Sequence, residues 1–139
     1  MYRYWRNTCK SWGMIFVDRG NREKAIKSME EAAEKVSNGK NLVTFPEGTR
    51  STSGQLLTFK KGSFIIAQKR NIPIVPMAIF GADKALKKGS FWVKPHPIHV
   101  HVCKAITAKE YQGMTHTALA EYCRNKIQGY LEQYKPEAK

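Results

Sequence analysis

The residues best suited to chemistry stand together in one short segment, Phe45-Pro46-Glu47-Gly48-Thr49-Arg50-Ser51. It follows Leu42-Val43-Thr44, an apolar and β-branched run that predicts a buried strand. Pro46 fixes its own φ and Gly48 permits backbone geometries that other residues resist, so the segment predicts a sharp turn. Ligands of open α/β sheets usually bind at the carboxyl ends of strands, where this turn places a carboxylate, a hydroxyl and a guanidinium.

Arg50 is the candidate anchor for a phosphate, because its planar guanidinium donates two parallel charge-assisted hydrogen bonds. Glu47 has two candidate roles, which are to orient Arg50 or to accept a hydrogen bond from a substrate hydroxyl. Gly48 and Thr49 complete the predicted substrate-binding turn. The alternative is a surface turn in which Glu47 and Arg50 pair with each other and bind nothing.

Two lysines extend this candidate site. Lys60 and Lys61 precede a predicted helix, Phe64–Lys69. The free N–H groups and the positive dipole end of a helix N-terminus can hold an anion. The sequence therefore predicts a phosphate site reached by Arg50 and at least one lysine, with solvated surface charge as the alternative for each lysine.

A second arginine, Arg19, follows another predicted strand, Met14–Val17. If that strand and the strand before the turn are parallel neighbours, the guanidinium groups of Arg19 and Arg50 converge. The alternative for Arg19 is a pair with Asp18 that only shapes the chain reversal.

The pattern of elements around these residues alternates between strand and helix, which predicts an α/β fold with a mostly parallel sheet flanked by helices. His99 and His101 share one face of a predicted strand, which favours a polar sheet face over a metal site. We expect no metal. The expected strands are 14–17, 42–44, 72–79 and 98–102. Three helices are expected. The first begins at Arg22 and stops at Asn38-Gly39, the second covers 64–69, and the third runs from about 115 to 134.

Composition bounds the class of protein. The 139 residues are 42% hydrophobic and predict a single domain over 1–139. The net charge of +13 favours anionic partners such as phosphorylated metabolites, anionic lipid or nucleic acid. The three cysteines are too widely spaced for a disulfide framework or a zinc site. No apolar run approaches the roughly 20 residues that span a bilayer, and no signal peptide is visible.

Three blocks of the sequence resemble the glycerolipid acyltransferases, in particular the 1-acylglycerol-3-phosphate acyltransferase family. The turn at 45–51 is similar to the family's substrate-binding motif. Gly13–Arg19 resembles the preceding block, and Ile74–Ile79 resembles the strand that follows. The resemblance covers about residues 12–106. It implies transfer of a fatty acyl group from acyl-CoA or acyl carrier protein to lysophosphatidic acid, giving phosphatidic acid, with no cofactor.

The resemblance also implies a place of action and a substrate-side role for Arg19. We expect a peripheral protein at the cytoplasmic face of a membrane, in contact with an anionic lipid surface and not with nucleic acid. The alternative function is a non-catalytic basic domain that binds anionic lipid or nucleic acid. A nucleic-acid domain would place its basic residues along a strip of exposed aromatics, and no such motif is visible.

One part of the family's pattern is absent. Its catalytic block, Asn-His followed by four residues and Asp, would stand upstream of all three matching blocks, so the sequence resembles an N-terminally truncated member. His116 and Glu121 have the right spacing, but five residues along a helix separate two side chains by roughly 140°. We expect no catalytic residue and no turnover from this chain alone. Truncation is the favoured explanation; a histidine from a second polypeptide and a binding-only protein remain open.

Overall fold

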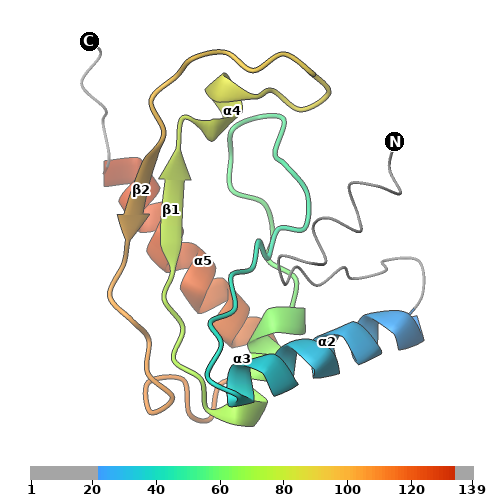
Figure 1. The fold of residues 1–139 in the computed structure, drawn as a ribbon. Helices are drawn as coiled ribbons and strands as arrows, with labels where there is room; N and C mark the ends of the chain where they lie inside the picture. The colour runs from blue at the N-terminus through green and yellow to red at the C-terminus, as the bar shows by residue number, and fades with distance from the viewer. Residues whose placement is uncertain (1–21, 134–139) are drawn as a thin grey trace. The chain divides into compact units, whose positions relative to one another are not determined.

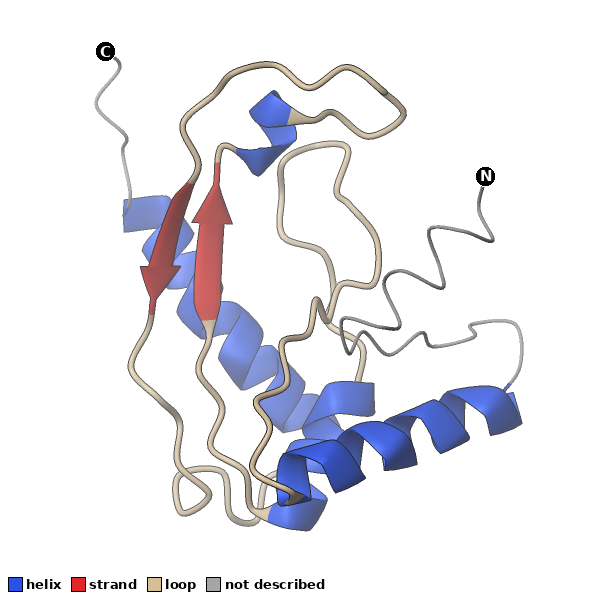
Figure 2. Ribbon diagram, viewed as in Figure 1, coloured by secondary structure: helices blue, strands red, loops and turns tan. Residues whose placement is uncertain are grey.

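The computed structural model describes residues 22–133, which form four helices and two strands (Figure 1). Figure 2 shows that long loops form most of the connections between the strands and the helices. The chain divides into two compact units between Val43 and Thr44. The elements in chain order are α2 (Arg22–Ser37), α3 (Gly62–Arg70), β1 (Met77–Phe80), α4 (Ala82–Ala85), β2 (His99–Val102) and α5 (His116–Gln133).

Helix α2 is the described element of the first unit, and it ends where the sequence predicts. Gly39 has a φ of 78°, a left-handed conformation that glycine adopts readily. Its N–H donates to the Val36 carbonyl at 3.0 Å, and the N–H of Lys40 donates to the Lys35 carbonyl at 3.1 Å. These two bonds form a Schellman motif, which satisfies carbonyls that the helix end would otherwise leave unpaired.

The second unit contains a two-stranded antiparallel sheet. Strands β1 and β2 pair with Met77 opposite Val102 and Phe80 opposite His99. An isolated bridge between Ile74 and Ile106 continues the pairing beyond the strand ends. The sheet therefore brings the segment before β1 and the segment after β2 together at one end of this unit.

Helix α5 supports the sheet, because it packs against both β1 and α3. Leu119 is fully buried at this junction, with 0% of its surface exposed. No helix within residues 22–133 is long and apolar enough to cross a bilayer. The buried core of this unit comprises Phe59, Phe64, Ala78, Ile106, Tyr111, Leu119, Ala120, Cys123 and Ile127.

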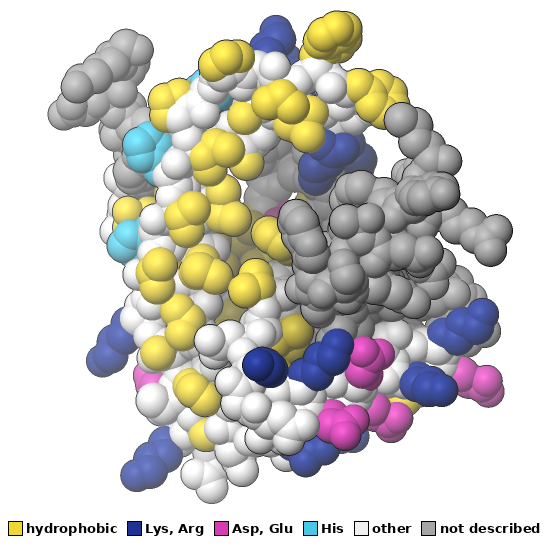
Figure 3. Space-filling model, viewed as in Figure 1, with side chains coloured by type: hydrophobic (Ala, Val, Ile, Leu, Met, Phe, Trp, Pro, Cys, Tyr) yellow, Lys and Arg dark blue, Asp and Glu magenta, His cyan; other side chains and the backbone are white. Residues whose placement is uncertain are grey.

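His99 and His101 share one face of the sheet, as the alternation predicts. His99 is exposed, but His101 is half-buried. His101 stacks on Tyr130 of α5, with ring centroids 3.4 Å apart, and Phe80 meets the same tyrosine edge-on. The other face is apolar and exposed, and Figure 3 shows it as a group of hydrophobic side chains. Its members are Val75, Met77, Ile79, Val100 and Val102.

Three strand predictions need correction or fall outside the described residues. Residues 42–44 form no strand in the structure, and Val43 is 66% exposed, because no described segment offers them a ladder partner. The predicted strand 72–79 shortens to β1 plus the bridge at Ile74, since proline has no N–H to donate and Pro73 and Pro76 interrupt the ladder. The predicted strand 14–17 lies outside the described residues. The helices and sheet form an α/β unit as predicted, but the described sheet is antiparallel.

Candidate functional site

The segment at 45–48 folds as the predicted turn. The N–H of Gly48 donates to the Phe45 carbonyl at 3.0 Å, and Gly48 has a φ of 70°. The carbonyl of Pro46 accepts from the N–H of Lys60 at 2.8 Å. This second bond ties the turn to the residues that lead into α3. The turn and the N-terminus of α3 are therefore one local assembly, although they are separated in the sequence.

Glu47 fastens the loop that follows the turn. Its Oε2 accepts from the N–H of Leu57 at 2.8 Å, which closes the loop over 48–56. Within residues 22–133, Glu47 forms no ion pair with Arg50. The structure therefore gives Glu47 a backbone partner ten residues away. The Glu47–Arg50 pair, which the sequence offered as an alternative, is not formed.

Arg124 of α5 holds the other side of Leu57. Its Nε donates to the Leu57 carbonyl at 3.1 Å, and its Nη2 donates to the Leu56 carbonyl at 2.8 Å. Leu57 is thus bonded through its N–H to Glu47 and through its carbonyl to Arg124. Charge-assisted bonds of this kind are about twice as strong as neutral ones, so they fix the end of the loop.

Sequence reasoning did not select Arg124, although a signal was present. Arg124 lies four residues after Ala120 and three before Ile127, both buried in the core. A cation at helical spacing within an apolar stripe needs polar partners, because leaving it unpaired next to a core is costly. Two backbone carbonyls of the candidate loop provide those partners.

Lys60 lies directly against the turn. A Cβ built on Gly48 would come within 3.1 Å of Lys60 Cε and 3.4 Å of Lys60 Nζ. Lys61 is the N-cap residue of α3 and makes no side-chain cap hydrogen bond. The structure therefore places Lys60 beside the turn and Lys61 at the helix N-terminus.

The remaining candidate residues are exposed or lie outside the described range. Thr49 and Arg50 are exposed at the start of the loop, and Arg50 forms no ion pair within the described part of the chain. Arg19 lies outside residues 22–133, so its predicted convergence with Arg50 stays a prediction. The structure brings Glu47, Gly48 and Lys60 together, and Arg50 is exposed three residues after Glu47.

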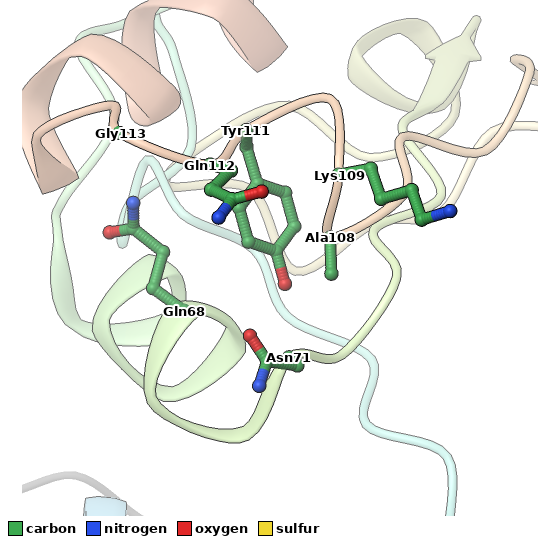
Figure 4. Close-up of a pocket in the computed structure, with 7 residues that line it drawn as sticks. All are labelled: Gln68, Asn71, Ala108, Lys109, Tyr111, Gln112 and Gly113. Atoms are coloured by element: carbon green, nitrogen blue, oxygen red, sulfur yellow. The ribbon is translucent and has the colours of Figure 1, made fainter.

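The pocket drawn in Figure 4 lies at the opposite end of α3. It has a volume of about 320 Å³, and Tyr111 projects into it from the segment before α5. The Tyr111 hydroxyl is bonded to the carbonyls of Ala67 and Ile72, at 3.0 and 2.9 Å. Gln68 Nε2 donates to the Met114 carbonyl at 2.8 Å. These polar groups hold the protein together, so we assign the pocket no ligand. It is lined by Gln68, Asn71, Ala108, Lys109, Tyr111, Gln112 and Gly113.

His116, the one histidine with a carboxylate at the family spacing, has another partner. Its Nδ1 is hydrogen-bonded to Gln68 Oε1 at the start of α5. Within residues 22–133, no ion pair joins it to Glu121. The described residues also contain no group of three or more metal-ligating side chains.

Comparison with known proteins shows that the chain is similar to one group of enzymes. The model of the acyltransferase family matches residues 1–80. A 1-acyl-sn-glycerol-3-phosphate acyltransferase from Limnanthes douglasii is 43% identical over 98 residues, which cover 70% of this chain and 35% of the relative. A putative 1-acyl-sn-glycerol-3-phosphate acyltransferase from Caenorhabditis elegans is 33% identical over 126 residues, covering 89% of this chain and 45% of the relative.

A solved structure is similar as well. The crystal structure of a 1-acyl-sn-glycerophosphate acyltransferase from Thermotoga maritima matches with a TM-score of 0.74 and 30% sequence identity. The match covers 84% of this chain and 47% of that one. The chain therefore spans between a third and a half of the length of these relatives.

Proposed function

The chain belongs to the acyltransferase family, and we propose that it binds the phosphate of 1-acylglycerol-3-phosphate in an acyl transfer of phospholipid biosynthesis. The donor would be acyl-CoA or acyl carrier protein, and the product phosphatidic acid. The observation that carries the proposal is the joined turn and helix: Arg50 follows the turn, and Lys60 lies against Gly48 at the entry to α3.

The charges and backbone groups of this assembly suit a phosphate. Helix α3 has no acidic residue in its first turn, so its free N–H groups face no competing carboxylate. Arg50 is exposed and forms no ion pair within residues 22–133, so a ligand need not displace a partner among them. We propose Arg50, Lys60 and Lys61 as the phosphate-binding cations, joined by Arg19 from the preceding block.

Glu47, Gly48 and Thr49 have supporting parts in this proposal. Glu47 anchors the loop through Leu57, which fixes the chain that carries Arg50. Gly48 leaves room for Lys60 because it has no side chain. Thr49 directly precedes Arg50, and we propose that its hydroxyl donates to a phosphate oxygen.

Acyl transfer to a glycerol hydroxyl also needs a base that removes the alcohol proton. His116 is engaged with Gln68 and has no carboxylate partner among the described residues. We therefore propose that this chain provides substrate binding, and that the base is not His116. We further propose that the protein works peripherally at the cytoplasmic face of a membrane.

The direct test is lysophosphatidic acid binding by Arg50→Ala, measured calorimetrically with the ligand below its micelle concentration. We expect affinity to fall at least tenfold, because a charge-assisted hydrogen-bonded pair is lost. Arg70→Ala is the matched control, since it removes the same charge from the far end of α3. If both variants and the unmodified protein bind lysophosphatidic acid with equal affinity, Arg50 is not part of the phosphate site. Tighter binding to polynucleotide than to lysophosphatidic acid would instead favour the basic-domain alternative.

A further inference from the structure

The connection between α4 and β2 carries the most exposed aromatic side chains among the described residues. Phe91 is 99% exposed, Trp92 is 83% exposed and Val93 is 71% exposed. We call residues 87–94 the aromatic loop. Three consecutive large apolar residues in water are unfavourable in an isolated protein, and such patches commonly mark an interaction site.

The aromatic loop has a defined anchor. The N–H of Ser90 donates to the Lys87 carbonyl at 3.1 Å, and the Ser90 Oγ accepts from the N–H of Trp92 at 3.1 Å. At the loop's end, the N–H of Lys94 donates to the Ala85 carbonyl of α4 at 2.8 Å. The loop thus presents Phe91 and Trp92 from a hydrogen-bonded turn.

The charged residues around the aromatic loop are mostly lysines. Lys87, Lys88 and Lys94 are exposed within the loop, and Lys84 of α4 precedes them. Asp83 is the only acidic residue between 71 and 106. Lysines around exposed tryptophan and phenylalanine match an anionic bilayer surface, where aromatic rings settle at headgroup level and cations meet lipid phosphates.

The position of the aromatic loop adds to this match. In Figure 1 the loop lies at the end of the second unit toward which β1 runs, and the loop after Arg50 extends toward the same end. A bilayer meeting this end would therefore lie near the chain that carries the proposed phosphate anchor.

We propose that the aromatic loop docks on an anionic lipid bilayer, with Phe91 and Trp92 inserted at the interface and the neighbouring lysines against lipid headgroups. The proposal deepens the proposed function, because lysophosphatidic acid would be taken from that bilayer. It differs from substrate binding in the residues it requires, since none of them belongs to the turn or to α3.

The test uses the full 139-residue chain and vesicles of phosphatidylcholine with or without 30 mol% phosphatidylglycerol, a composition chosen for the assay. We expect binding to the anionic vesicles, measured by flotation, to weaken at least tenfold in Phe91→Ser/Trp92→Ser. Lys87→Gln/Lys88→Gln should weaken it severalfold and reduce its salt sensitivity. Lys69→Gln/Lys109→Gln is the control of equal charge from the opposite end of the unit, and it should bind as the unmodified protein does.

Tryptophan fluorescence reports whether the loop itself enters lipid. In a Trp5→Phe/Trp12→Phe background, Trp92 is the single tryptophan, and its emission should shift to shorter wavelength and be quenched by brominated lipid. Unchanged Trp92 emission on vesicles that bind the protein would overturn the proposal. So would unaltered vesicle binding by Phe91→Ser/Trp92→Ser.

Lysophosphatidic acid binding below the micelle concentration separates this proposal from the proposed function. We expect Phe91→Ser/Trp92→Ser to bind lysophosphatidic acid normally but to bind vesicles weakly. Arg50→Ala should bind vesicles normally but bind lysophosphatidic acid weakly. Loss of both by the loop variant, with unchanged circular dichroism, would mean that the loop belongs to the substrate site and would overturn its role as a separate docking surface.

Discussion

Lys60 lies so close to Gly48 that a Cβ on this glycine would come within 3.1 Å of Lys60 Cε. Such a contact is closer than carbon atoms normally approach, so any side chain at position 48 must move the lysine. The same glycine holds a φ of 70°, which other residues adopt only with strain. Gly48 therefore serves both the backbone turn and the placement of a cation.

Replacing this glycine separates the two effects when Gly54 is used as the control. Gly54 has a φ of 74°, but a Cβ there meets nothing within 4 Å. Gly48→Ala and Gly54→Ala should each lower the free energy of unfolding by about 1 kcal/mol, the cost of a left-handed alanine. Only Gly48→Ala should also weaken lysophosphatidic acid binding, by several-fold. Equal binding by the two variants in calorimetry would show that the position of Lys60 does not matter.

The bonds around Leu57 predict that Arg124 stabilises the loop after Arg50. Arg124→Ala removes two charge-assisted bonds to the Leu56 and Leu57 carbonyls, and we expect a loss of about 1–3 kcal/mol in the free energy of unfolding. Arg124→Lys should recover only part of it, because an ammonium cannot reproduce the planar fork. Denaturant titration measures this loss, with Asn125→Ala as an exposed control on the same helix.

Hydrogen exchange tests the partner on the other side of Leu57. Glu47→Ala leaves the Leu57 N–H without its 2.8 Å acceptor, so amides in 51–58 should exchange faster. Glu47→Gln retains a carbonyl acceptor and should exchange at an intermediate rate. Unaltered exchange in both variants would mean that Glu47 does not fasten the loop in solution.

Cys123 predicts a loss of stability in alkaline solution. It is 2% exposed, and burial raises the pKa of its thiol from 9.0 to about 11. The unfolded chain then loses this proton first, so the stabilising effect is complete below about pH 9 and declines as pH rises toward 11. The predicted decline is on the order of 1 kcal/mol by pH 10. Denaturant titrations at pH 8 and pH 10 in reducing buffer measure it, and Cys123→Ala should lack this contribution.

The helices could be predicted from the sequence because their signals are local. The stop of α2 at Gly39 follows from glycine's access to positive φ, and the apolar spacing in 115–134 predicts α5. The turn at 45–48 is local too, since Pro46 and Gly48 fix it within four residues. Each of these elements has its main hydrogen bonds within a few residues of its own sequence.

The remaining features depend on partners that are distant in the sequence. The apolar run at 42–44 has the composition of a buried strand, but a strand also needs a neighbour, and the described residues provide none. Arg124 reaches Leu57 across 67 positions, which no short-range pattern encodes. His101 is half-buried because Tyr130 of α5 stacks on it, and the alternation within 98–102 does not encode that contact. In each of these examples, the presence or absence of a tertiary contact determines the observed structure.

The most direct test compares two ligands that differ only in phosphate, lysophosphatidic acid and the corresponding monoacylglycerol, for the unmodified chain, Arg19→Ala and Arg50→Ala. The unmodified chain should prefer the phosphorylated ligand at least tenfold, and each variant should lose most of that preference while its affinity for monoacylglycerol stays constant. A preference that survives both substitutions, or no preference in the unmodified chain, would contradict a phosphate site built on these two arginines.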